Sequence, residues 1–208
     1  MSELFSIQLQ NRQQQGRDGV WLDLPTTTEQ VQAALRQIDI SSDNPQGLFI
    51  SGYFAEEEKR IAIPYNMVLA SNVDELNFLA ARLETLSAGE RAELNAALQT
   101  PQSEFSSIGR ITDFPENVDY YVHLPDVRGP AQLGDYYLNR SGMVDMPEEW
   151  KGGIDTAQFG RYVAQQEQGV FTEYGYLVKS GDAWQKVHEG QPVPEEYRVL
   201  SFPAPEVM

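Results

Sequence analysis

The first part of the chain combines alternating and helical patterns of apolar positions. Leu4–Leu9 alternates apolar and polar side chains, and Val20–Leu22 resumes an extended run after a glycine-containing turn, so both are predicted to be strands. Four later apolar positions fall on one face of a predicted helix: Val31, Ala34, Leu35 and Ile38. Extended patterns return at Gly47–Phe54 and Ile61–Ile63. Residues 1–68 are therefore predicted to form a small antiparallel sheet with one helix.

The middle of the chain has helical periodicity. Asn72 is a suitable N-cap for one helix. Ser87 and Glu90 have the spacing of a capping box, in which each side chain binds the other's free backbone amide. A third, shorter helix is predicted around Ser103–Ile111. Residues 69–112 are thus predicted to be a helical domain.

The last part mixes both patterns again. Its predicted elements are a strand at Val118–Leu124, a helix from Pro130 through Arg140, a helix from about Asp155 to Glu167, and strands at Val170–Thr172 and Tyr174–Val178. Pro130 suits the first turn of a helix, and Gly142 suits its end. With a partly irregular tail from about residue 179, these elements make residues 113–208 a mixed domain. The overall prediction is an α+β fold of three small domains.

The charge of the chain indicates a candidate binding protein, which the pattern of apolar positions alone does not. The 208 residues carry 31 acidic and 15 basic side chains, a formal net charge of −16. Residues 51–150 hold seventeen of the acids and seven of the bases, so the acidity is concentrated in the middle. Such a field repels nucleic acid and anionic lipid and attracts basic surfaces. Acidity that serves solubility alone remains an alternative.

The sequence gives no positive sign of catalysis or of a cofactor. Cysteine is absent, which excludes disulfides and thiolate metal sites, and His123 and His188 lack metal-ligand spacing. Phosphate-binding loops and nucleophile elbows are also absent, and the segment 113–124 fails as a calcium loop because Val118 replaces the required glycine. We expect no catalytic residue, metal or cofactor. Without a secretory signal or a membrane span, the protein is expected to be soluble and cytoplasmic.

Three local motifs occur in order near the end of the chain. They are Gln132–Gly142 completed by Pro147, then Ile154–Arg161, then Phe171–Leu177, and an early motif, Val20–Pro25, precedes them. In this order and spacing they resemble the ArdA family of antirestriction proteins, from about Val20 to Leu177. The first of the three resembles the family's antirestriction motif. The tail beyond about Lys179 departs from that pattern, and whether it packs on the third domain or binds a second partner stays open.

The resemblance implies a fold and a function. ArdA-like proteins are carried on mobile genetic elements and form elongated dimers of small domains that follow the shape of B-form DNA. They occupy the DNA-binding groove of type I restriction-modification enzymes, so the implied partners are a methyltransferase core and a second copy of the chain, without nucleic acid or membrane. Motif residues are expected to make fold or dimer contacts: Leu133, Gly134, Tyr136, Tyr137, Gly142, Pro147, Phe159, Gly160 and Arg161.

Carboxylates are the expected chemistry of such a DNA mimic. Neighbours at i,i+3 or i,i+4 on a helix lie about 5–6 Å apart, which suits charge offered at phosphate-like intervals. The candidate mimic carboxylates are Glu84, Glu90, Glu93, Glu104, Asp113, Glu116, Asp119, Asp126, Asp135, Asp145, Glu148, Glu149 and Asp155. Alternatives are a decoy for another DNA-binding protein (a CRISPR effector, a nucleoid protein or a repressor), an adaptor with incidental acidity and, less favoured, an acid/base hydrolase.

Overall fold

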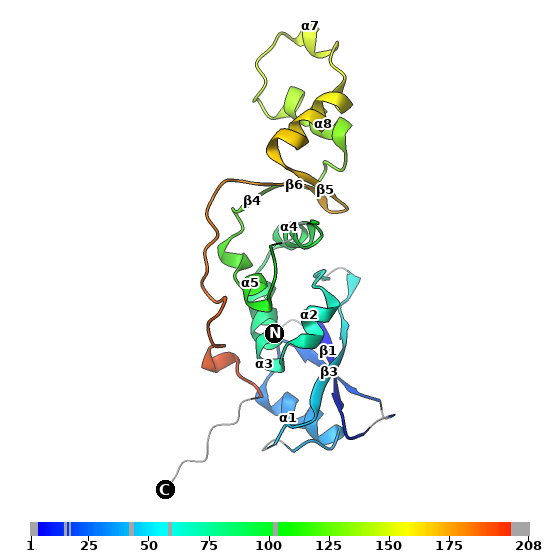
Figure 1. The fold of residues 1–208 in the computed structure, drawn as a ribbon, viewed down its shortest axis with the longest axis vertical. Helices are drawn as coiled ribbons and strands as arrows, with labels where there is room; N and C mark the ends of the chain where they lie inside the picture. The colour runs from blue at the N-terminus through cyan, green and yellow to red at the C-terminus, as the bar shows by residue number, and fades with distance from the viewer. Residues whose placement is uncertain are drawn as a thin grey trace. The chain divides into compact units, whose positions relative to one another are not determined.

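The computed structural model describes residues 4–14, 16, 18–41, 44–57, 60–101 and 104–200. These residues group into two compact units, each built from more than one stretch of chain (Figure 1). The N-terminal unit contains the described residues within Met1–Leu86, Phe105–Glu116 and Gln185–Met208. The second unit contains those within Ser87–Glu104 and Asn117–Trp184.

A three-stranded antiparallel sheet organises the N-terminal unit. Its strands β1 (Phe5–Asn11), β2 (Val20–Leu24) and β3 (Leu48–Phe54) are ordered β2-β1-β3, so the first strand lies in the centre. The predicted alternation holds, since Ile7 and Leu9 are fully buried while their neighbours are only partly so. All three strands thus present one face to the core.

The strand predicted at Ile61–Ile63 is wrong. Both isoleucines are buried, but the segment has no strand pairing; instead the Tyr53 hydroxyl donates to the Ile61 carbonyl at 2.8 Å. The apolar alternation therefore reflects packing under the sheet rather than a fourth strand. Helix α2 (Tyr65–Ala70) was not predicted, because it begins after Pro64 without a side-chain cap.

Helices α1 (Thr28–Gln37) and α3 (Val73–Glu84) contact β2, and α2 contacts β3. Capping boxes fix the start of both longer helices, Thr27 with Gln30 for α1 and Asn72 with Glu75 for α3. Their inward positions complete the core of this unit: Val31, Leu35, Leu76, Leu79 and Leu83.

The third predicted helix of the middle region is shorter than expected. It is the single turn and a half of α5 (Ile108–Thr112), capped by Ser107, and a 3-10 turn, η2 (Phe114–Glu116), follows it. Both contact α3. Ser103, where the prediction began, lies outside the described residues.

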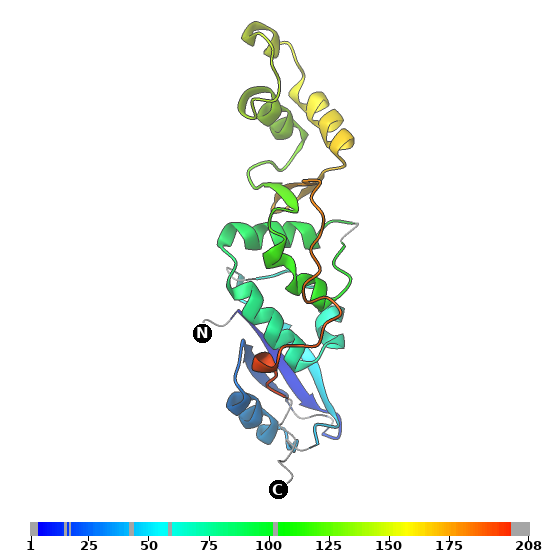
Figure 2. The same ribbon diagram turned by 90° about the vertical axis from the view of Figure 1, so that its left-hand side faces the viewer.

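The C-terminal segment, residues 185–200, runs along α5 and α3 and ends in a 3-10 turn, η4 (Glu195–Tyr197) (Figures 1 and 2). The ring of Phe78 contacts the rings of His188 and Tyr197, with centroids 4.9 and 4.7 Å away. Asn77 donates to the Tyr197 carbonyl at 3.0 Å. The part of the tail that the structure describes from residue 185 on therefore belongs to the N-terminal unit and does not pack only on the predicted third domain. Binding of a second partner by the tail stays an open alternative.

The second unit has its own three-stranded antiparallel sheet. Strands β4 (Tyr121–Leu124), β5 (Val170–Thr172) and β6 (Gly175–Lys179) are ordered β4-β6-β5. Helix α4 (Ala88–Leu98), which begins at the predicted Ser87 capping box, contacts β6. The sheet lies between α4 and the helices that follow β4 (Figures 1 and 2).

Those helices are α6 (Pro130–Asp135), which continues as a π-helix, η3 (Tyr136–Arg140), then α7 (Glu148–Lys151) and α8 (Thr156–Glu167). Pro130 occupies the first turn of α6, as predicted, but the regular helix expected through Arg140 changes to π geometry at the paired tyrosines. Helix α7 was not predicted. One hydrophobic cluster of this unit consists of the buried residues Val127, Leu133 and Tyr176.

The α+β fold class is confirmed, because the described residues form two three-stranded sheets and eight α-helices. The three-domain division at residues 68 and 112 stays a prediction. In the structure, the segments 105–116 and 185–200 belong to the same compact unit as the N-terminal sheet.

Candidate functional site

Four of the predicted carboxylates are exposed and unneutralised. Asp119, Asp126, Asp145 and Glu149 face solvent, and no cation among the residues that the structure describes forms an ion pair with them. All four belong to the second unit. A carboxylate in this situation keeps its full charge available to a basic partner.

Two further exposed carboxylates are held by neighbours within their own helix. Glu148 pairs with Lys151 at 2.6 Å across one turn of α7. Asp155 is the N-cap of α8, where its Oδ1 accepts the backbone N–H groups of Ala157 and Gln158 at 2.9 and 3.0 Å. Negative charge at a helix N-terminus is stabilising, so Asp155 has a structural role as well as an exposed position.

Two half-buried carboxylates of the second unit have their charge stabilised by specific donors. Asp135 accepts Asn139 Nδ2 at 2.8 Å and pairs with Arg140 at 2.9 Å, and the hydrogen bond from Asn139 is the first cause of its lowered pKa. Glu90 completes the α4 capping box, and its hydrogen bonds with Ser87 lower its pKa. Both are ionised at neutral pH, but their charge is partly used within the fold.

Three other half-buried carboxylates are also engaged. Glu104 accepts the Tyr120 hydroxyl at 3.0 Å and pairs with Lys179, an interaction that raises the lysine pKa. Glu116 pairs with Arg82. Glu84 has an interaction of its own and is half-buried on α3. Ion pairs of this kind reduce the charge that a partner would meet.

Glu93 is largely uncharged at neutral pH. It is half-buried on α4, and its Oε1 has no hydrogen-bond partner among the described residues. Burial raises its pKa to about 8, and the nearby Glu90 and Asp119 carboxylates add to the effect. The predicted i,i+3 pair of Glu90 and Glu93 therefore offers one negative charge at pH 7 rather than two.

The assignment of Asp113 as a surface carboxylate is wrong. Its exposed fraction is 0%, and its two oxygens accept the backbone N–H groups of His188 and Glu189 at 2.6 and 3.2 Å. A buried carboxylate that anchors a distant segment cannot present charge to a partner. The sequence around Asp113 could not predict this contact, because the two backbone partners of Asp113 lie 75 and 76 residues later.

The glycines of the first two motifs allow α6 and α8 to touch. A Cβ on Gly134 would lie 1.9 Å from the Thr156 carbonyl oxygen, and one on Gly160 would lie 1.8 Å from the Pro130 carbonyl oxygen. Atoms at such separations overlap, so no larger residue fits at either position without moving a helix. The two glycines thus allow a close approach of the helices, which is a fold contact of the kind expected for motif residues, and fully buried Leu133 lies beside it.

The paired tyrosines of the motif lie at the edge of the same core. Tyr136 and Tyr137 are half-buried and pack against it, with their ring centroids 5.5 Å apart. The Tyr137 hydroxyl donates to Glu167 at 2.9 Å, and burial is the first cause of the raised pKa of both groups. The guanidinium of Arg140 lies 6.0 Å from the centroid of the Tyr136 ring.

The remaining motif residues fall outside this cluster. Gly142 follows the π-helix with φ +70°, a left-handed conformation that suits the predicted helix stop. Pro147 precedes α7 and is exposed, Phe159 is half-buried on α8, and Arg161 is exposed on the same helix. Dimer contacts for any motif residue stay a prediction.

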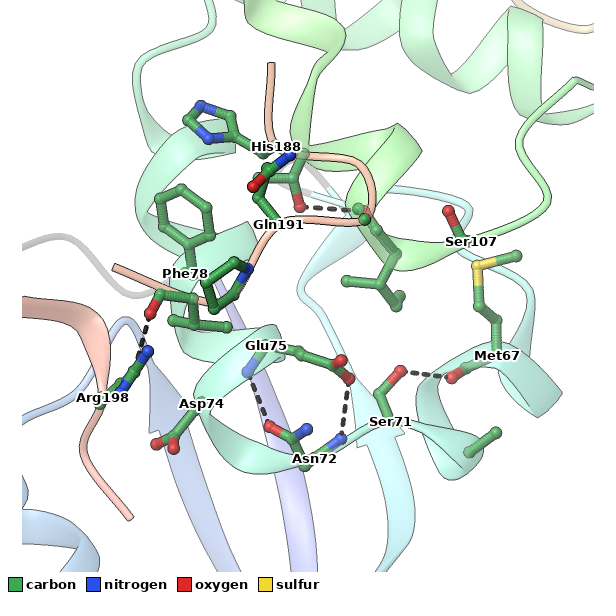
Figure 3. A pocket seen from close by; sticks show the side chains of 17 residues that line it. Met67, Ser71, Asn72, Asp74, Glu75, Phe78, Ser107, His188, Gln191 and Arg198 are labelled. Atoms are coloured by element: carbon green, nitrogen blue, oxygen red, sulfur yellow. Dashed lines mark hydrogen bonds between the residues drawn. The ribbon is translucent and has the colours of Figure 1, made fainter. Parts of the chain in front are cut away.

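A hollow of about 640 Å³ lies in the N-terminal unit between the start of α3, α5 and residues 188–198 (Figure 3). Its charged side chains are engaged by the protein itself. Asn72 and Glu75 cap α3, Asp74 Oδ1 accepts the backbone N–H groups of Val199 and Leu200 at 2.7 Å each, and Arg198 Nε donates to a backbone carbonyl at 2.7 Å. The pocket therefore has the character of a structural junction rather than of an acid/base centre.

Both histidines make structural contacts. His123 Nε2 lies 2.9 Å from the Tyr174 carbonyl oxygen, and the His188 ring packs edge-on against Phe78. Among the described residues, no group of three or more His, Asp or Glu side chains is placed to hold a metal ion. Within the same residues, no helix has the length and apolar character needed to cross a membrane.

Asp74 and Asn77 were not predicted as anchoring residues, because their backbone partners lie 120 to 126 residues later in the chain. Trp21 lies within the early motif Val20–Pro25, and its side chain is 49% exposed on β2. An aromatic residue alternating with buried leucines is the one signal that could have identified it as a surface residue.

Comparison with known proteins agrees with the order of the motifs. Among curated proteins, no sequence matches the chain. The family described as antirestriction protein (ArdA) matches residues 15–178, which include the early motif, all three later motifs and most of both sheets. The match covers well over half of the 208 residues. The chain therefore belongs to the ArdA family of antirestriction proteins.

Proposed function

We propose that this protein inhibits type I restriction-modification enzymes by mimicking B-form DNA. Its exposed carboxylates occupy the positions that DNA phosphates take in the binding groove of the methyltransferase core. The protein acts as a cytoplasmic homodimer and catalyses no reaction. The target enzyme, the mimicry of DNA and the dimer go beyond membership of the ArdA family, and they follow from what the resemblance implies.

The observation that carries the proposal is the group of exposed carboxylates without a cation partner in the described part of the chain: Asp119, Asp126, Asp145 and Glu149. We call this group the open acids. Like charges left unpaired destabilise a compact fold, so their retention favours a role in binding. Enzymes that bind DNA gain much of their affinity from Lys and Arg side chains placed against phosphates. The same side chains are the natural partners of the open acids.

Mimicry of phosphates has two consequences for the inhibited reaction. Phosphate contacts position a protein on DNA but carry little sequence information. The inhibitor should therefore act on type I enzymes of different sequence specificity. Inhibition should also weaken as salt is added, because exposed charges are screened over about 8 Å at physiological ionic strength.

The decisive experiment is competition with DNA for a purified type I methyltransferase core at low salt. The wild-type protein should displace DNA. A fourfold variant of the open acids, Asp119→Asn, Asp126→Asn, Asp145→Asn and Glu149→Gln, should raise the half-inhibitory concentration by about 100-fold, since complementary charge governs association. Each single substitution should change it by no more than about threefold, because the field is shared.

A matched control removes the same number of charges from the N-terminal unit. Asp18→Asn, Glu57→Gln, Glu195→Gln and Glu196→Gln are all exposed positions. This control variant should stay within about threefold of the wild type. Equal losses in the two variants would show that net charge, not the open acids, causes inhibition. A wild-type protein that leaves DNA binding untouched at low salt would remove the proposed function altogether.

A further inference from the structure

The outer face of the N-terminal sheet exposes aromatic side chains beside a carboxylate. Strand pairing places two rows of residues on this face: Trp21–Gln8–Gly52 and Asp23–Ser6–Phe54. The Trp21 side chain is 49% exposed and the Phe54 side chain is 58% exposed. Asp23 is exposed as well. We call these six residues the aromatic face. The early motif, whose exposed members the proposed function leaves unexplained, supplies Trp21 and Asp23.

Gly52 makes room for the indole on the sheet. A Cβ on Gly52 would lie 3.0 Å from Cη2 of Trp21 and 3.0 Å from Cβ of Gln8, closer than ordinary packing allows. The far end of the indole therefore extends across the central strand onto β3. An indole ring supported in this way offers a surface for stacking rather than a freely moving side chain.

Asp23 is positioned to act together with that ring. Residues i and i+2 of a strand point to the same side and lie about 7 Å apart, so one ligand can contact both Trp21 and Asp23. The Ser6 hydroxyl donates to Asp23 Oδ1 at 2.5 Å, which orients the carboxylate and leaves acceptor capacity on its oxygens. Asp23, Phe54 and Glu56 also line a shallow hollow of about 220 Å³.

The outer side of the sheet contacts one guanidinium at another ring, beside the aromatic face. Phe49 pairs with Gln10 and, by strand alternation, lies on the outer side; the Arg12 guanidinium carbon is 5.6 Å from its ring centroid. Arginine is planar, stacks on aromatic rings and pairs with carboxylates through two N–H groups, whereas the lysine ammonium is compact and strongly hydrated. A stacking ring next to an acceptor carboxylate thus matches arginine better than lysine.

We propose that the aromatic face is a binding site for an arginine side chain of the target enzyme, with the guanidinium stacked on Trp21 and paired with Asp23. This inference rests on the proposed function, which supplies a partner that engages DNA phosphates with lysine and arginine side chains. It adds a specific, partly apolar contact to the diffuse attraction of the open acids.

The first test needs no restriction enzyme. A capped peptide of alternating glycine and arginine is titrated into the full-length protein, and the indole N–H signals are followed by NMR; the signal lost in Trp21→Ala identifies Trp21. The Trp21 signal should shift, with an affinity for the arginine peptide about fivefold higher than for its lysine counterpart. Trp21→Ala and Asp23→Asn should each weaken binding about five- to tenfold, and Trp21→Phe should weaken it less. Trp150→Ala, which removes an exposed tryptophan of the other unit, is the matched control.

The second test measures inhibition, so that the two proposals fail separately. Trp21→Ala should raise the half-inhibitory concentration about tenfold, while Tyr162→Ala, which removes an exposed ring of the other unit that is not next to an open acid in sequence, leaves it unchanged. No shift of the Trp21 signal, or equal binding of the lysine peptide, overturns the arginine site even if the wild type inhibits. Peptide binding at Trp21 by a protein that inhibits nothing overturns the proposed function and leaves the arginine site standing. A change of oligomeric state in Trp21→Ala would instead make this face a contact between copies, contrary to the inference.

Discussion

In the N-terminal unit, Asp74 and Asp113 turn inward and accept backbone amides of the C-terminal segment, whereas in the second unit Asp145 and Glu149 face solvent without a cation partner in the described part of the chain. The residue type is similar, but the two pairs have opposite physical roles. Carboxylates that accept backbone amides stabilise a fold, and exposed ones contribute to its external field. The number of acids in a sequence is thus a poor measure of the charge that a partner meets.

The largest effect expected from this comparison is on stability, at Asp113. Asp113→Ala leaves the backbone N–H groups of His188 and Glu189 without their acceptor in a buried position, so the free energy of unfolding should fall by about 3 kcal/mol. Urea denaturation of the full-length protein measures the loss. Faster amide hydrogen exchange over residues 188–200 should accompany it. Asp119→Ala, at an exposed acid of the other unit, is the control and should change stability by less than about 0.5 kcal/mol. Equal stability of the two variants would contradict an anchoring role for Asp113.

A smaller effect, dependent on pH, is expected at Glu93. Its pKa of about 8 lies above the ordinary value of 4.5, so its protonated form favours folding. That stability is complete below about pH 4.5 and is lost as the pH rises through 8. Glu93→Gln should therefore leave stability nearly unchanged at pH 5 and raise it by roughly 1 kcal/mol at pH 9, after allowance for partial solvent screening.

Glu90, on the same helix, should show the opposite dependence of stability on pH. Hydrogen bonds with Ser87 lower its pKa from 4.5, so the stability that it provides is present above that value and is lost as the pH falls through its lower folded-state pKa. Thermal unfolding of Glu93→Gln and Glu90→Gln, measured from well below pH 4.5 up to pH 9, distinguishes the two cases. A pH-independent effect of Glu93→Gln would show that burial does not perturb this carboxyl.

The smallest change in stability is expected at the exposed acids themselves. Asp145→Asn combined with Glu149→Gln should alter the free energy of unfolding by no more than about 0.5 kcal/mol, because neither side chain has an ion-pair partner in the described residues. Earlier elution from an anion exchanger would confirm the loss of charge. Destabilisation of more than about 1 kcal/mol would mean that these acids support the fold, which would blur the contrast between the units.

Local signals in the sequence predicted the starts and contacts of several helices. The Asn72 cap, the capping box of Ser87 and Glu90, and Pro130 in the first turn all depend on residues within a few positions of one another. Gly134 and Gly160 are expected to make fold or dimer contacts as motif residues, and the close approach of α6 and α8 is a fold contact. Such features are fixed by short stretches of chain and can be recognised there.

Features that depend on distant partners could not be predicted. Ile61 and Ile63 have a strand-like pattern, but what buries them is packing and not a neighbouring strand. The exposure of an acid depends on whether another segment supplies amides, as residues 188 and 189 do for Asp113. The sequence could therefore predict that the candidate site consists of carboxylates. Which carboxylates are exposed could be decided only from the structure.

The N-terminal unit is discontinuous along the chain, since it combines residues from the first 86, from 105–116 and from 185 onward. During synthesis, Asp74 and Asp113 leave the ribosome long before the amides that they bind, whereas the second unit is complete by Trp184. The nascent chain must therefore wait for residues 185–200 before these two carboxylates gain the backbone donors of that segment. Slow translation of the codons for this segment would extend the time during which the N-terminal unit is vulnerable to proteases.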